Sequence, residues 1–200
     1  MGDASCLQGL GASVQSMRSR RVFAHRGFTL IELLVTLAVA AILLGIAMPA
    51  FNSFVQGTRL ATEANALVYD MNLARSEAVK LDVTVQVCAS SDHATCNSMN
   101  WADGWIVLCP ANCPPGLGAS PALLRVAPAI NAANTVREES AAASMVSFQS
   151  TGQTGTTLQY VFCDRRGAAQ GREVEVNSIG EIISSATPGQ TVSNTPLGAC

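Results

Sequence analysis

Residues 26–35 read Arg26-Gly27-Phe28-Thr29-Leu30-Ile31-Glu32-Leu33-Leu34-Val35, and they open an apolar run that continues to Phe51. Glu32 is the only charged residue among the 24 residues from Phe28 to Phe51. As a helix, this segment would rise about 36 Å, which is enough to cross a hydrocarbon core about 30 Å thick. A carboxylate inside a membrane costs about 2.5–3.5 kcal/mol on insertion scales. The position of Glu32 therefore indicates a function.

The flank before the apolar run is basic. It has no acid after Asp3, and its arginines are Arg18, Arg20, Arg21 and Arg26. An excess of arginine keeps its side of a membrane segment in the cytoplasm. We therefore expect residues 1–27 to be cytoplasmic and the C-terminal part of the chain to cross the membrane.

A secretory signal peptide is the alternative interpretation. Such a signal has a shorter apolar core, followed by a small-residue cleavage site. Here the small residue, Gly27, precedes the apolar run instead. Cleavage after Gly27 would place the α-amine of Phe28 four residues before Glu32. Residues four apart share a face of a helix, so the amine and the carboxylate can pair within one chain or between neighbouring chains.

The motif from Gly27 to Val35 resembles the class III signal of type IV pilins and of the pseudopilins of type II secretion. The resemblance implies that a prepilin peptidase cuts after Gly27 and methylates Phe28, and that Glu32 helps to dock the subunit into a growing filament. Residues 1–27 would then be a cleaved leader. This leader is long, and Met17 is the more ordinary start, so we assign residues 1–16 no structural role.

A long helix is predicted from Phe28 onward. Pro49 predicts a kink or local melting near the end of the apolar run. Apolar residues then recur at alternating spacings of four and three, which is typical of an amphipathic helix. They are Leu60, Ala64, Leu67, Met71, Ala74, Ala78 and Leu81. We expect residues 28–53 to be embedded in a membrane or filament and residues 54–82 to dock on a domain. A coiled coil is the alternative, but the stripe spans only three heptads and is rich in alanine.

Short β-branched and aromatic segments follow Leu81, separated by glycine, proline, asparagine and serine. They are Thr84–Cys88, Trp105–Leu108, Leu123–Val126, Met145–Phe148, Leu158–Phe162, Glu173–Val176 and Glu181–Ile183. This order predicts an α+β protein in which residues 83–200 form a β-rich domain, with one antiparallel sheet or two packed sheets. The tail from Ser184 is rich in Thr, Ser, Gly and Pro, and we expect it to be a surface segment.

Two further segments carry a resemblance to the GspH/FimT family of minor pilins and pseudopilins. They are Trp101-Ala102-Asp103-Gly104-Trp105 and Phe162-Cys163-Asp164-Arg165-Arg166-Gly167-Ala168-Ala169-Gln170-Gly171-Arg172. The resemblance covers residues 26–183 and implies the type IV pilin-like fold, a long hydrophobic helix packed on an antiparallel sheet or sandwich. From their own chemistry, Trp101 and Trp105 predict core packing beside a turn at Gly104.

Six cysteines follow the leader, and an even number in a translocated domain favours disulfides. Sequence proximity favours Cys88–Cys96 and Cys109–Cys113, which leaves Cys163–Cys200 to tie the tail to the domain. A zinc site at Cys109 and Cys113 is the alternative, but no second matched pair exists and His93 is the only histidine after the leader. We therefore expect no metal.

The sequence contains no motif that indicates catalysis. A catalytic triad would have only His93 as its base, the acids are scattered, and no phosphate-binding or dinucleotide motif is present. We expect neither an enzyme nor a cofactor. The chain from Phe28 holds 8 basic and 13 acidic residues, a formal charge of −5, which argues against generic nucleic-acid binding.

A local basic cluster is the remaining candidate for ligand binding. Arg165, Arg166 and Arg172 lie within eight residues of one another, and arginines on a loop can bind DNA phosphates. The FimT branch of the family resembles a DNA-uptake receptor with a Gly-Arg-x-Arg motif, but here Gly171-Arg172 is followed by Glu173 and Val174. The alternative is a solvated hairpin loop with local ion pairs such as Asp164–Arg165.

The resemblance as a whole implies a minor pilin. Such a subunit is anchored in the bacterial inner membrane with a periplasmic C-terminal domain, and it joins other major and minor pilins through its N-terminal helix. It would support pilus assembly, twitching, adhesion and DNA uptake. The alternatives are a GspH-like pseudopilin of type II secretion and a DNA-binding receptor at the pilus tip.

Overall fold

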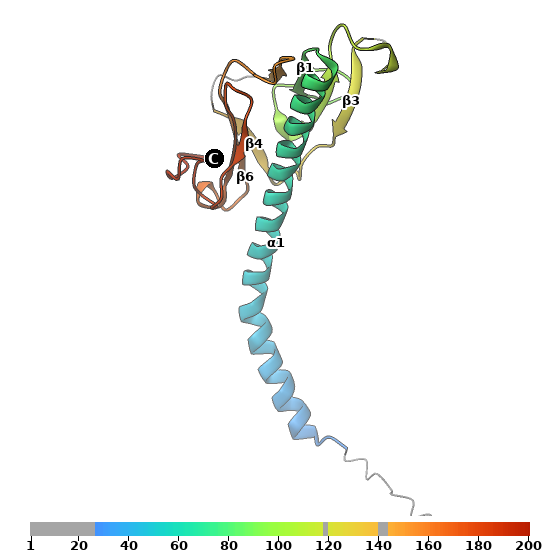
Figure 1. Ribbon diagram of the computed structural model, residues 1–200. Helices are drawn as coiled ribbons and strands as arrows, with labels where there is room; N and C mark the ends of the chain where they lie inside the picture. The colour runs from blue at the N-terminus through green and yellow to red at the C-terminus, as the bar shows by residue number, and fades with distance from the viewer. Residues whose placement is uncertain (1–26, 118–119, 140–143) are drawn as a thin grey trace, which may run out of the picture. The chain divides into compact units, whose positions relative to one another are not determined.

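The computed structural model describes residues 27–117, 120–139 and 144–200, and the predicted leader before Gly27 lies outside the described residues. Helix α1 runs without interruption from Leu30 to Leu81, 52 residues (Figure 1). The chain divides into two compact units within this helix, one ending at Gly45 and one beginning at Ile46. The second unit holds the rest of α1 and all the strands.

Pro49 lies inside α1 and does not end it. The local melting that the sequence allowed at this position is therefore absent, while a kink stays a prediction. A proline inside a helix removes one backbone hydrogen bond, and its ring crowds the carbonyl of residue i−4, at a cost of about 3 kcal/mol. The residues before Pro49 are mainly leucine, isoleucine, alanine and methionine. Most of these residue types favour a helix, so the helix continues through the proline.

Within the described residues, eight strands form two sheets in which every neighbouring pair is antiparallel. The first sheet has the order β3-β2-β1-β5 and the second β4-β6-β7-β8. The strands are β1 (Val85–Ala89), β2 (Trp105–Cys109), β3 (Ala122–Ala127), β4 (Thr135–Glu138), β5 (Met145–Phe148), β6 (Leu158–Cys163), β7 (Arg172–Val176) and β8 (Ile182–Ser184). All seven strands expected from the sequence are present, and the structure adds β4.

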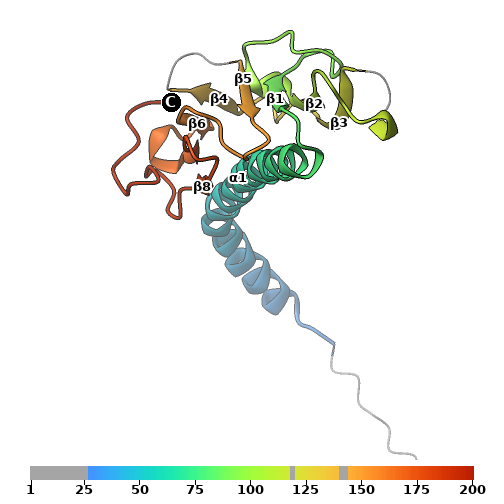
Figure 2. The same ribbon diagram turned by 45° about the horizontal axis from the view of Figure 1, so that its top comes forward.

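The C-terminal half of α1 packs beside both sheets (Figure 2). Six of the seven stripe residues are fully buried, from Leu60 to Ala78, and they share one core with residues of β1, β2, β5, β6 and β7. Leu81 is only partly buried. The stripe therefore covers sheets and does not form a coiled coil, as expected.

The two tryptophans lie in this core, where the sequence placed them. Trp101 and Trp105 are 1% and 2% exposed, and the ring of Trp101 meets Tyr160 edge-on with centroids 4.7 Å apart. Gly104 turns the chain between them with φ of 106°, a conformation that favours glycine. A Cβ at Gly104 would lie 2.6 Å from the carbonyl oxygen of Ala127, so this turn also needs the missing side chain.

Three disulfides join the cysteine pairs that proximity favoured. Cys88–Cys96, Cys109–Cys113 and Cys163–Cys200 have Cα–Cα distances of 5.5, 5.9 and 5.7 Å. Cys109 and Cys113 are thus bonded to each other in this structure, as proximity favoured. Among the described residues, no group of three or more His, Cys, Asp or Glu side chains lies close enough to hold a metal ion.

The C-terminal tail is held to the domain by more than its cysteine. Leu197 is buried against Val161 and Cys163. The backbone N–H of Val192 donates to Oε2 of Glu173 at 2.5 Å, and this carboxylate is 1% exposed. The expected surface segment therefore supplies both an apolar contact and a hydrogen bond to the second sheet.

Candidate functional site

The N-terminus of α1 is capped by Thr29. The N–H of Glu32 donates to Oγ1 of Thr29 at 3.2 Å, and the N–H of Leu33 donates to its carbonyl oxygen at 3.1 Å. Thr29 and Glu32 have the Thr-x-x-Glu spacing of a capping box, and an acid in the first turn also interacts favourably with the helix dipole. Glu32 therefore sits where its charge supports the start of the helix.

Phe28 precedes the first helical residue. The helix was expected from Phe28, but Thr29 caps it and Leu30 begins it. Phe28 and Glu32 consequently do not share a helical face in the chain before cleavage. Pairing between the amine and the carboxylate stays a prediction for the processed subunit.

The first half of α1 exposes its apolar side chains on every side. Every residue from Leu30 to Phe54 is exposed, and Leu30, Ile46 and Phe54 keep 70% or more of their surface accessible. The helix is long and apolar enough to cross a membrane by length and composition. An apolar surface of this size needs a membrane or other apolar helices to cover it.

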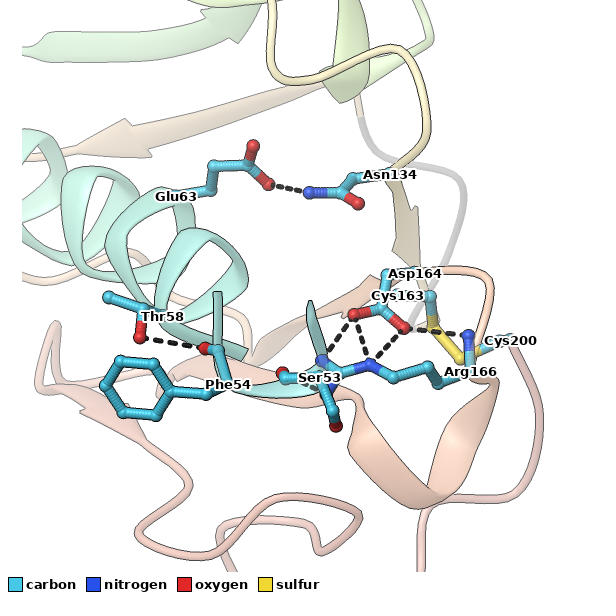
Figure 3. A network of polar contacts seen from close by, with 9 residues as sticks. All are labelled: Ser53, Phe54, Thr58, Glu63, Asn134, Cys163, Asp164, Arg166 and Cys200. Atoms are coloured by element: carbon cyan, nitrogen blue, oxygen red, sulfur yellow. Dashed lines mark hydrogen bonds and ion pairs between the residues drawn. A yellow bond between two sulfur atoms is a disulfide. The ribbon is translucent and has the colours of Figure 1, made fainter. Parts of the chain in front are cut away.

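Arg166, by contrast, is fixed within the protein (Figure 3). Its Nη2 lies 2.5 Å from Oδ2 of Asp164, and its Nη1 donates to the carbonyl oxygen of Ser53 on α1 at 2.9 Å. The expected pair Asp164–Arg165 is thus wrong: the turn after β6 directs the second arginine, not the first, back onto Asp164. Burial acts to raise the pKa of Asp164, but the hydrogen bonds and charge of Arg166 outweigh it and hold the pKa below its usual value.

The three arginines of the predicted DNA site line two different cavities. Arg166 and Arg172 line a cavity of about 460 Å³ against α1, and Nη1 of Arg172 donates to the carbonyl oxygen of Ser185 at 3.4 Å. Arg165 is exposed and lines a different cavity. Because Arg166 is already paired with Asp164, DNA binding by this cluster stays a prediction with less support than the sequence suggested.

Two acids of α1 have structural roles that the sequence analysis missed. Asp70 is 1% exposed, accepts from Nε1 of Trp105 at 2.9 Å, and pairs with Nε of Arg125 at 2.5 Å. Glu63 accepts from the backbone N–H of Asn131 at 3.1 Å and from Nδ2 of Asn134 at 2.7 Å (Figure 3). In the sequence, Asp70 directly precedes Met71, a residue of the predicted buried stripe. An acid next to such a stripe is the one sequence signal that could have indicated the buried role of Asp70.

Comparisons with known proteins agree with this arrangement. Residues 63–180, more than half of the chain, match the family described as type II transport protein GspH, and residues 23–48 match the prokaryotic N-terminal methylation motif. A comparison with curated proteins gave no match.

Three solved structures are similar to the chain. Two are crystal structures of the Pseudomonas aeruginosa type IV minor pilin FimU, with 22% and 23% identity and TM-scores of 0.54 and 0.56. They cover 70% and 74% of this chain and 99% and 98% of theirs. The third is the minor pseudopilin EpsH of the Vibrio cholerae type 2 secretion system, with 11% identity, a TM-score of 0.44, and coverage of 64% and 97%.

The likeness to FimU confirms the type IV pilin-like α+β fold. The family match spans the C-terminal part of α1 and nearly all the strands, and the methylation motif spans Gly27, Phe28 and Glu32. The chain belongs to the GspH family of minor pilins and pseudopilins.

Proposed function

We propose that this chain is a minor pilin, a structural subunit of a type IV pilus. The observation that carries the proposal is the first half of α1, which exposes apolar side chains on all sides and holds Glu32 as its only charge. Helices of this kind cover one another when subunits pack side by side. The work of the protein is then assembly, and no catalytic step is assigned to it.

The proposed sequence of events begins at the inner membrane. The basic flank stays in the cytoplasm, the apolar half of α1 spans the bilayer, and the disulfide-containing domain lies in the periplasm. Prepilin peptidase cuts after Gly27 and methylates Phe28. The subunit then leaves the bilayer and joins other pilins, with Glu32 paired to the amine of Phe28 in its own chain or in a neighbour.

The alternative function is a pseudopilin of a type II secretion system, which the description of the matching family favours. The anchor chemistry is common to both assemblies. The fold likeness to FimU, whose structures are described as those of a type IV minor pilin, supports the pilus. DNA binding has less support than the sequence suggested, because Arg166 already binds Asp164 and Ser53 within the subunit.

Fractionation of the source bacterium tests whether the chain is a pilus subunit or a pseudopilin of a type II secretion system. Pili sheared from cells that carry a tagged copy should contain the chain with a methylated Phe28 as its N-terminus, as shown by mass spectrometry. Deletion of the gene should reduce surface pili and leave the secretion of exoproteins unchanged. Absence from sheared pili, together with a loss of exoprotein secretion, would assign the chain to the secretion system instead.

The variant Glu32→Ala tests the role of the intramembrane acid. We expect normal cleavage after Gly27, because the peptidase site is kept, and reduced incorporation into filaments, because the acid can no longer pair with the amine. Glu77→Ala, which removes an acid from the other end of α1, is the matched control. Normal incorporation of Glu32→Ala would contradict the pairing of acid and amine.

A further inference from the structure

Two exposed arginines line one small cavity beside α1. Arg59 comes from the helix and Arg165 from the turn after β6, and both line a cavity of about 160 Å³. Gln56 and Asn131 line it too. Neither arginine side chain has a hydrogen-bond or ion-pair partner in the described part of the chain. The cavity therefore holds two guanidinium groups whose charge the subunit itself does not satisfy.

The acids that could neutralise these arginines are engaged elsewhere. Glu63 lies four residues after Arg59, a spacing that favours pairing on a helix, but its carboxylate accepts from the loop at Asn131 and Asn134. Asp164 directly precedes Arg165, but it is bound by Arg166 through both carboxylate oxygens. Because Glu63 is held by this loop and Asp164 by Arg166, the side chains of Arg59 and Arg165 are left free to bind a group from outside.

The lining suits a carboxylate. A guanidinium group presents a planar set of N–H donors that matches the two oxygens of a carboxylate. The side-chain amide of Asn131 adds a neutral donor, since its oxygen already accepts from the N–H of Ala133 at 2.9 Å. A volume of about 160 Å³ is below that of ordinary small-molecule sites, which run from about 300 Å³ upward. It accommodates one acidic side chain.

A polyanion fits this site less well than a single acid. Asp164 lines the cavity, Glu63 lines a second cavity that shares Arg59 with it, and the chain from Phe28 carries a formal charge of −5. The negative charges of the chain would repel successive phosphates of a DNA backbone. A single carboxylate next to Arg59 and Arg165 is nearest to the two positive charges, so attraction dominates.

We propose that Arg59 and Arg165 bind an acidic side chain of the neighbouring filament subunit. The inference rests on the proposed function, because the helix residues that line the cavity follow directly on the exposed apolar segment through which subunits pack. An acid on the neighbour, seated between the two guanidinium groups, would fix the register in which this subunit joins the filament.

Charge reversal in the full-length chain, expressed in its own bacterium, tests the proposal. Arg59→Glu combined with Arg165→Glu should reduce the share of the chain found in sheared filaments about tenfold or more, because like charges brought together across an interface are strongly unfavourable. Arg59→Lys combined with Arg165→Lys keeps the charge and should retain most incorporation. Lys80→Glu reverses a single charge, half the change in the double variant, at an exposed position of α1 and should leave incorporation unchanged.

A photo-cross-linking residue in place of Gln56 gives a readout that does not depend on the folding of the charge variants. In otherwise unaltered chains it should capture another pilin, at a peptide that contains Asp or Glu. Failure to capture a pilin, or incorporation of the Glu variant equal to that of Lys80→Glu, would overturn the inference while the proposed function stands. Absence of the unaltered chain from sheared pili would overturn the proposed function.

DNA is the competing ligand, and the same variants separate it from a pilin. Binding of duplex DNA by the detergent-solubilised chain that is lost in the Glu variant, with unchanged incorporation into filaments, would assign the cavity to phosphate and overturn the carboxylate proposal.

Discussion

The buried carboxylate of Asp70 should be the polar group on which the packing of α1 depends most. Asp70→Ala removes the acceptor of Trp105 Nε1, a bond of 2.9 Å between side chains that are 1% and 2% exposed. An unpaired buried donor costs about 1–3 kcal/mol. The ion pair with Arg125 adds less than about 1 kcal/mol, since the arginine is 46% exposed and screened by water. We expect a loss of about 1–4 kcal/mol in the free energy of unfolding.

Urea unfolding of a fragment from Ser53 to Cys200, followed by tryptophan fluorescence, measures this loss. The fragment lies within one compact unit and keeps every contact of Asp70. Glu77→Ala is the control, because Glu77 makes an exposed pair with Lys80 and should change the free energy by less than about 0.5 kcal/mol.

A double-mutant cycle with Arg125→Ala separates the two interactions of Asp70. Arg125→Ala leaves the hydrogen bond to Trp105 but removes the counter-charge of a buried acid, so it should itself be destabilising. The two changes should not be additive. An Asp70→Ala fragment as stable as the Glu77→Ala fragment would refute the reasoning, because it would mean that the bond to Trp105 contributes nothing to packing.

Three further perturbations follow from single features of the domain. Gly104→Ala should lower the free energy of unfolding by more than about 3 kcal/mol, because the backbone has a positive φ and a Cβ would lie 2.6 Å from a carbonyl oxygen. Gly116→Ala is the control: the space around Gly116 is open, so the same urea titration should show little change. Burial raises the pKa of Glu173, so its carboxyl stabilises the fold most below its unfolded pKa, about 4.3, and this contribution is lost as the pH rises through the raised folded pKa. Glu173→Gln should therefore gain stability relative to the unaltered fragment between pH 4 and pH 7. Cys200→Ser opens a loop with a sequence separation of 37, which should cost about 4 kcal/mol by loop entropy and expose the tail to limited proteolysis.

Each of these expectations has a clear contrary result. Equal urea midpoints for the two glycine variants would show that the turn tolerates a side chain. A constant difference between Glu173→Gln and the unaltered fragment across the pH range would mean that the carboxyl does not titrate differently on folding. A tail that resists proteolysis in Cys200→Ser would show that its other contacts suffice.

Periodic features of the structure could be predicted because they depend on local sequence. The stripe from Leu60 to Ala78 follows the helical period, and the seven expected strands follow the clustering of β-branched and aromatic residues. The two short-range cysteine pairs followed from proximity. The strand β4 escaped this reasoning because Thr135–Glu138 has one apolar residue, Val136, and becomes a strand only by pairing with β6.

Polar contacts between distant segments could not be predicted in the same way. Ser53 and Arg166 are separated by 113 residues, and Asp70 and Arg125 by 55. Nothing local to Arg165 and Arg166 says which of them returns to Asp164 and which faces outward. The choice depends on where the turn after β6 lies against α1, and that is set by the packing of the whole domain.

By itself, the sequence pointed to the family to which this protein belongs and predicted how it is anchored. The motif at Gly27, the apolar segment and Glu32 are contiguous, so their chemistry can be read along the chain. Only the tertiary structure decided which charges are available for binding. Folding uses Asp70, Glu63, Asp164 and Arg166 to join helix, loops and sheets, and it leaves Arg59 and Arg165 together at one cavity, because partners are assigned by proximity in space and not by order in sequence.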